Sequence, residues 1–122
     1  METYTSEELT KALKVVSSNL SKCEKMQIKF KKGTSQHTLL KNRIKALEIS
    51  KSLIENGDSI NKYSKEDLLE ATRPILSIIS KCEKAQSKFD AGTANYNRFN
   101  DLIKTMYISK SLITDGISKE CL

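Results

Sequence analysis

The sequence has few of the residues and motifs from which catalytic and metal sites are built. Its 122 residues include one histidine, four glycines and three cysteines, with no nucleophile elbow, paired-cysteine zinc spacing or phosphate-cradling glycine loop. His37 and three scattered cysteines would not close a tetrahedral zinc site within one chain. We therefore expect a protein that is not an enzyme and that uses no metal and no cofactor.

Long apolar runs and secretion signals are also missing. No apolar run approaches the ~18 residues of a membrane-spanning helix, so we expect no membrane segment. The start of the chain, Met1 to Tyr4, has neither the basic residues nor the apolar stretch of a secretory signal. Cys23 and Cys82 fall on predicted apolar stripes and Cys121 stands alone, which is no disulfide framework. These features predict a cytoplasmic protein.

Positive charge is present, but it is unevenly distributed. The net charge is +6, and residues 4–57 hold eleven Lys and Arg against five Asp and Glu, whereas residues 63–116 hold eight against seven. A basic excess favours a nucleic-acid-binding protein. Its confinement to one half, without a recognition-helix motif, makes that function an alternative and not our first choice.

The chain contains an internal repeat of 59 residues. Shifting the sequence by 59 superposes residues 4–57 on residues 63–116 without a gap, with 24 identities in 54 positions. The densest match places Ser21–Lys25 on Ser80–Lys84. A period of this length indicates a supersecondary unit that buries its apolar face against its copy.

Each repeat is predicted to be a helical hairpin. Thr5 and Ser64 are N-cap residues, with the acidic partners of a capping box, Glu8 and Asp67, three residues later. The apolar seam of the first helix is predicted to be Leu9, Leu13, Val16, Leu20, Cys23, Gln27 and Phe30, and the second copy has its own equivalents. We expect Gly33 and Gly92 to end the first helix of each hairpin at a tight turn, and Gly57 and Gly116 to end the second.

The predicted fold is all-α, a four-helix bundle in one domain, residues 1–122. Hairpin 1 spans residues 4–57, hairpin 2 spans residues 63–116, and residues 58–62 are a short polar linker. Pro74 lies about ten residues into the third helix, where it removes a backbone hydrogen bond. That helix is therefore expected to be kinked, or interrupted with a late start at Thr72.

Lysines beside the seam are the first candidate ligand-binding residues. They form one ridge in each repeat, Lys22, Lys25 and Lys29 in the first and Lys81, Lys84 and Lys88 in the second. Two equivalent cationic ridges would suit phosphate groups. The alternative is that the lysine stems cover apolar surface while their charged ends remain in water.

Polar seam residues and the turns between helices provide further candidates. Gln27 and Gln86 occupy seam positions, so each amide either belongs to a polar layer that fixes helix register or hydrogen-bonds a ligand. Thr34 with His37, and Thr93 with Tyr96, place a hydroxyl, free backbone N–H groups and a ring at a predicted helix start. This combination suits an anion beside an aromatic base, although helix capping alone also explains the threonines.

Parts of the first repeat resemble a known group of proteins. Ser21–Lys25, Gly33–Leu40 and Arg43–Leu47 look like segments of short bacterial and prophage proteins of obscure function that carry one such hairpin. Arg43 joins the candidate ligand-binding residues through this stretch, and in the second repeat its place is taken by Leu102. More loosely, the hairpin is similar to phage anti-defence proteins that oligomerise and sequester nucleotide-derived immune signals.

The looser resemblance implies a non-catalytic homo-oligomer that sequesters an anionic, nucleotide-like small molecule such as a cyclic nucleotide or an ADP-ribose derivative. The duplicated lysines and the lack of a catalytic set agree with it, because sequestration needs tight anion binding and no chemistry. Two other functions remain open: a protein-interaction module or inhibitor that docks on a host protein, and the nucleic-acid-binding protein considered above.

Overall fold

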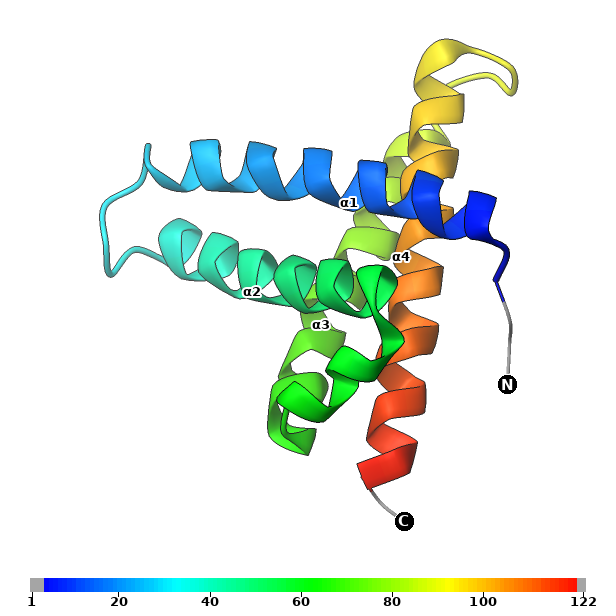
Figure 1. Ribbon diagram of the computed structural model, residues 1–122. Coiled ribbons are helices and arrows are strands. Elements are labelled where there is room, and N and C mark those ends of the chain that lie inside the picture. The colour runs from blue at the N-terminus through cyan, green and yellow to red at the C-terminus, as the bar shows by residue number, and fades with distance from the viewer. Residues whose placement is uncertain (1–3, 121–122) are drawn as a thin grey trace.

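The computed structural model describes residues 4–120, which form four long helices and one short 3₁₀ helix without any strand (Figure 1). Hairpin 1 consists of α1 (Ser6–Gln27) and α2 (Ser35–Glu55), and hairpin 2 of α3 (Lys65–Gln86) and α4 (Ala94–Glu120). The 3₁₀ helix η1 (Gly57–Lys62) joins the hairpins. The prediction of an all-α bundle of four helices is confirmed. Cys121 lies outside the described residues.

The predicted helix starts are confirmed at atomic detail. The Thr5 hydroxyl accepts a hydrogen bond from the Glu8 N–H at 3.1 Å, and the Glu8 carboxylate accepts one from the Thr5 N–H at 3.0 Å. Ser64 and Asp67 form the same capping box in hairpin 2, at 3.1 and 3.2 Å. These reciprocal bonds satisfy backbone donors that every helix start leaves free.

The ends of α1 and α3 differ from the prediction. Both helices end at glutamine, Gln27 and Gln86, six residues before the glycines that were expected to end them. Gly33 and Gly92 instead have φ values of 90° and 91° in the loops that follow. There the Thr34 N–H donates to the Lys31 carbonyl at 3.3 Å, so Gly33 is the third residue of a four-residue turn that needs positive φ. The connection is thus a seven-residue loop and not a tight turn.

Two further helix boundaries were predicted wrongly. The α3 helix is continuous through Pro74, so the expected interruption and late start are wrong, and a kink there stays a prediction. The Thr72 hydroxyl, which was expected to cap a helix, instead donates to the Leu68 carbonyl at 3.0 Å inside α3. The α4 helix continues past Gly116 to Glu120, whereas α2 ends at Glu55, close to the predicted Gly57.

The predicted linker is a packed part of the fold. Residues 58–62 belong to η1, in which Ser59 is buried and donates to the Ser52 carbonyl at 3.0 Å. Ile60 packs so tightly against the backbone of Gly116 that a Cβ atom on this glycine would overlap the Ile60 side chain. Gly116 is therefore a contact point between η1 and α4 and not a helix stop.

The two hairpins lie across one another, and their contacts follow the repeat (Figure 1). Helix α1 packs on α4 as α3 packs on α2, and α2 also contacts α4, its own equivalent. The first helix of each hairpin thus contacts the second helix of the other hairpin. Two units related by an approximate two-fold axis have this contact pattern. The resulting core combines residues of all four helices: Ala12, Val16, Leu20, Cys23, Leu40, Ala46, Leu47, Ile49, Leu53, Ile54, Leu68, Ala71, Ile75, Ile78, Ile79, Cys82, Met106 and Ile113.

The middle of the predicted seam, Val16, Leu20 and Cys23, is in this core, but its two ends are not. Phe30 lies beyond the end of α1 and is exposed, while Leu9 and Leu13 are half-buried. Buried serines were not foreseen: the hydroxyls of Ser50 and Ser109 donate to the carbonyls of Ala46 and Thr105, at 2.9 and 3.1 Å. Small residues at these positions let the helices approach closely, and the hydrogen bond satisfies each hydroxyl.

Candidate functional site

The predicted lysine ridges are exposed and are shorter than expected. All six lysines are exposed, and none of them forms an ion pair with a described residue. Because α1 ends at Gln27 and α3 at Gln86, Lys29 and Lys88 lie beyond the helices and do not continue the rows. Lys81 alone among the six lines a central cavity that is described below. The ridges as such do not form a hollow.

The threonines at the helix starts are occupied by capping. The Thr34 hydroxyl accepts from the His37 N–H at 3.3 Å and donates to the Lys31 carbonyl at 2.7 Å. Thr93 makes the equivalent two bonds, to Tyr96 and Asp90, at 3.3 and 2.8 Å. The hydroxyl hydrogen is used in both copies, so a ligand at either turn would meet backbone N–H groups and neighbouring side chains.

The seam glutamines lie at the ends of the hairpins. The Gln86 side-chain amide donates to the Tyr96 carbonyl at 3.2 Å and so ties the end of α3 to the first turn of α4. Beside it, the rings of Phe89 and Phe99 stack with centroids 6.0 Å apart. Gln86 therefore closes its hairpin, a structural use that the polar-layer hypothesis did not anticipate.

Gln27 instead lines a hollow at the distal end of hairpin 1. This tip hollow has a volume of about 550 Å³ and is lined by Gln27, Lys32, Gly33, His37, Thr38 and Lys41. It combines two predicted site residues, Gln27 and His37, with two lysines that the sequence analysis did not single out. The lining contains no carboxylate, and it lies at the N-terminal end of α2, where backbone N–H groups carry partial positive charge. The equivalents of Lys32 and Lys41 in hairpin 2 are Ala91 and Asn100, so only hairpin 1 carries this charge.

A smaller cavity lies at the centre of the molecule, where all four helices meet. This central cavity has a volume of about 130 Å³ and is lined by Asn19, Cys23, Arg43, Ile78, Lys81, Cys82 and Leu102. Six of these seven residues form three pairs related by the 59-residue repeat: Asn19 with Ile78, Cys23 with Cys82, and Arg43 with Leu102. The approximate two-fold axis therefore passes through the cavity.

Arg43 is the most unusual group in this cavity. Its Nε and Nη2 atoms are buried, and within residues 4–120 they are the buried side-chain nitrogens without a hydrogen-bond partner. Burial raises the pKa of both the Cys23 and the Cys82 thiol above its ordinary value, and the positive charge of Arg43 opposes that rise. Arg43 as a whole is half-buried, and its two buried, unused donors favour an anion beside them.

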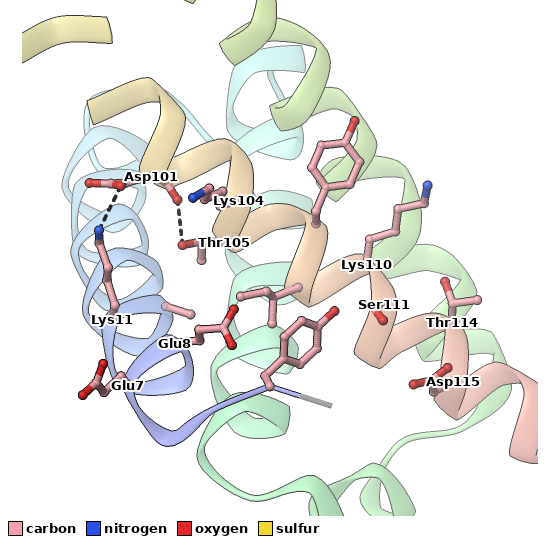
Figure 2. Close-up of a pocket in the computed structure, with 14 residues that line it drawn as sticks. Glu7, Glu8, Lys11, Asp101, Lys104, Thr105, Lys110, Ser111, Thr114 and Asp115 are labelled. Atoms are coloured by element: carbon pink, nitrogen blue, oxygen red, sulfur yellow. Dashed lines mark hydrogen bonds and ion pairs between the residues drawn. The ribbon is translucent and has the colours of Figure 1, made fainter. Parts of the chain in front are cut away.

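A larger hollow is a groove between α1 and α4, shown in Figure 2. It measures about 770 Å³, and Lys11 pairs with Asp101 across it at 3.1 Å. A related groove of about 670 Å³ lies between α2 and α3, where Lys45 pairs with Asp67 at 3.4 Å and with Glu70 at 3.9 Å. The α1/α4 groove has four carboxylates and three lysines in its lining and holds none of the predicted site residues, so it is a poor match for an anionic ligand.

Comparison with protein-family models, with curated proteins and with solved structures finds no match to the chain. Within the described residues, no group of three or more His, Cys, Asp and Glu side chains is placed to hold a metal ion. The helices of residues 4–120 include none with an apolar stretch of the length that a bilayer crossing needs. The candidate site therefore has to be chosen on its own geometry.

Sequence reasoning missed Lys32, Lys41 and Asn19. A signal for the two lysines was present, because they belong to the basic excess of the first repeat. No signal marked Asn19, which aligns with an isoleucine and takes part in the central cavity only through the crossing of the hairpins.

Proposed function

We propose that the protein is a non-catalytic binding protein that takes an anionic, nucleotide-like small molecule in the tip hollow. The observation that carries this proposal is the lining of that hollow, with Lys32, Lys41 and His37 at a helix start and no carboxylate. In this proposal the protein acts as a phage-type sponge that sequesters a nucleotide-derived immune signal, such as a cyclic nucleotide or an ADP-ribose derivative.

The size and chemistry of the tip hollow suit such a ligand. Its volume of about 550 Å³ falls within the range of roughly 300–1,000 Å³ that is typical of small-molecule sites. Two lysines and the first N–H groups of α2 would neutralise a phosphate. The half-buried His37 ring offers a stacking surface for a base, and the Gln27 amide offers a donor and an acceptor. One binding site per chain is proposed, since hairpin 2 lacks both lysines.

Ligand-induced stabilisation tests this proposal. Melting temperatures are measured for the wild type and for the double variant Lys32→Ala/Lys41→Ala with a panel of cyclic nucleotides and ADP-ribose derivatives. A ligand at about 100 times its Kd adds about 2.7 kcal/mol to the free energy of unfolding, which raises the melting temperature by several degrees. The wild type should show this rise with at least one compound, and the double variant should lose it.

The ridge variant Lys22→Ala/Lys25→Ala is the matched control, because it removes the same charge from the same hairpin outside the hollow. It should keep the wild-type response. Absence of any response across the panel, or equal losses in both double variants, would contradict the tip-hollow proposal. Binding to any DNA duplex with a steep salt dependence would instead favour the nucleic-acid function.

A protein-interaction module is the second candidate, and exposed apolar side chains favour it. Met26, Ile28 and Phe30 are exposed at the distal end of hairpin 1, and Ile28 has 85% of its surface accessible. Its equivalent in hairpin 2 is Ser87. Ile28→Ser should abolish stoichiometric co-purification of a partner while leaving nucleotide binding intact, if this second function is correct.

The homo-oligomer and the cytoplasmic location stay predictions. Sedimentation analysis would measure the oligomeric state.

A further inference from the structure

The central cavity has features of an anion site that are separate from the tip hollow. Arg43 on α2 presents two buried donors without a partner, and the cavity is also lined by the side chains of Lys81 on α3 and Asn19 on α1. No carboxylate is among its seven lining residues. The Glu24 and Glu83 carboxylates act on the two thiols from outside the lining, and Lys81 is exposed. The unmet charge is therefore that of the two buried Arg43 donors, which favour an anion beside them.

We propose that the central cavity binds a small inorganic oxyanion of the phosphate or sulfate class. The guanidinium would donate through Nε–H and Nη2–H in the side-by-side geometry that matches two oxygens of such an ion. Lys81 and the Asn19 amide would donate to the oxygens on the other side. Because Lys81 is exposed, the cavity opens to solvent on its side, and an ion can enter there.

The volume restricts what this site can hold. About 130 Å³ corresponds to roughly four water molecules at ~30 Å³ each. An oxyanion with five heavy atoms fits this space together with residual water, whereas a nucleoside does not. The central cavity is therefore a site for a free ion and is distinct from the nucleotide-sized tip hollow.

The position of the cavity on the approximate two-fold axis explains why it holds one arginine. Arg43 and Leu102 are repeat equivalents that reach the same small space from α2 and α4. A second guanidinium at position 102 would place two like charges together and fill the cavity. Leu102 and Ile78 instead add apolar side chains to the lining, which lowers the local dielectric and strengthens charge-assisted hydrogen bonds.

The two thiols are compatible with an anion in this cavity. Burial raises the pKa of Cys23 and Cys82, so both remain protonated and uncharged at neutral pH. Neutral S–H groups are weak donors and do not repel an oxyanion, whereas thiolates would neutralise Arg43 themselves. The cavity therefore keeps its positive charge at neutral pH.

Isothermal titration of the full chain with sodium phosphate, sodium sulfate and sodium chloride at matched ionic strength tests this proposal. We expect saturable binding of phosphate or sulfate with one ion per chain. Arg43→Leu, which copies the residue of the second repeat, should weaken that binding by at least about tenfold, since it removes a charge-assisted pair of hydrogen bonds. Arg43→Lys, a second variant that keeps the charge but loses the paired donors, should bind several-fold more weakly than the wild type.

The double variant Lys32→Ala/Lys41→Ala removes the tip-hollow lysines and should still bind one oxyanion per chain, which separates this site from the tip hollow. Lack of saturable oxyanion binding would overturn the proposal. Unchanged affinity in both Arg43 variants would do so as well, and chloride that binds as tightly as the oxyanions would overturn the assignment of the ion class.

Discussion

Replacing Arg43 by leucine should stabilise the protein in buffer that contains neither phosphate nor sulfate. The wild-type side chain buries two nitrogen donors without partners, and each unmet donor costs about 1–3 kcal/mol. Leucine occupies the equivalent position 102, half-buried against the core, so the local backbone accepts it. The shorter side chain enlarges the cavity, which offsets part of the gain. We expect a net increase of about 1–3 kcal/mol in the free energy of unfolding.

Urea denaturation followed by circular dichroism measures this change as a higher midpoint at unchanged slope. The reverse variant, Leu102→Arg, is the matched control and should destabilise the fold by about 3–5 kcal/mol, because it adds a second unpaired guanidinium to the same cavity. Saturating oxyanion should narrow the gap between the wild type and Arg43→Leu. A lower midpoint for Arg43→Leu in oxyanion-free buffer would refute the reasoning, since the guanidinium would then be a favourable part of the folded state.

Three other predictions concern packing, capping and pH. Gly116→Ala gains helix propensity of about 1 kcal/mol, but its Cβ atom overlaps Ile60. Thermal denaturation should therefore show a net loss of about 1–2 kcal/mol in the free energy of unfolding. The control Gly57→Ala meets no neighbour and should be close to neutral. Thr5→Ala removes a capping box, and chemical denaturation should show a loss of about 1 kcal/mol. Asp67 has a pKa below its ordinary 3.8, chiefly because the Ser64 N–H donates to it, so its ionised form stabilises the fold at neutral pH. The stability difference between the wild type and Asp67→Asn should therefore vanish as the pH falls through that lowered pKa, which melting curves across acidic pH would show.

Helix starts were predictable from the sequence because capping is a local interaction. Thr5 with Glu8, and Ser64 with Asp67, bond across three residues, and no distant part of the chain affects that geometry. Helix ends were less predictable. The apolar spacing runs on to Phe30 although α1 ends at Gln27, because residues outside a helix can still pack at the end of a hairpin. The stacked Phe89 in hairpin 2 shows this.

The role of the linker depended on tertiary contact. Residues 58–62 are polar except for Ile60, and their composition predicts a connection exposed to water. The contact between Ile60 and Gly116 forms only when α4 packs against η1, so composition does not predict it. Gly116, which was expected to end a helix, lies within α4. Ridge lysines were likewise chosen because both copies kept them, but they lie on exposed surface and form no hollow of their own.

In the central cavity the two repeats contribute different residues to one space. Residues shared by both copies are good candidates when each copy has its own site. At a two-fold axis, both copies line one space. A residue that is present in only one copy can then serve that space alone. Arg43 stood out as unmatched in the alignment with Leu102, yet these two residues line the same space.

This placement on the axis also bears on how the chain arose. A homodimer of separate hairpins is translated from one gene, so the residues on the two sides of its axis are identical, whether two arginines or two leucines. Joining two hairpins in one reading frame removes that identity and allows each half to mutate independently. The pairs Arg43 with Leu102 and Asn19 with Ile78 are differences that a homodimer of one hairpin could not carry at such a position.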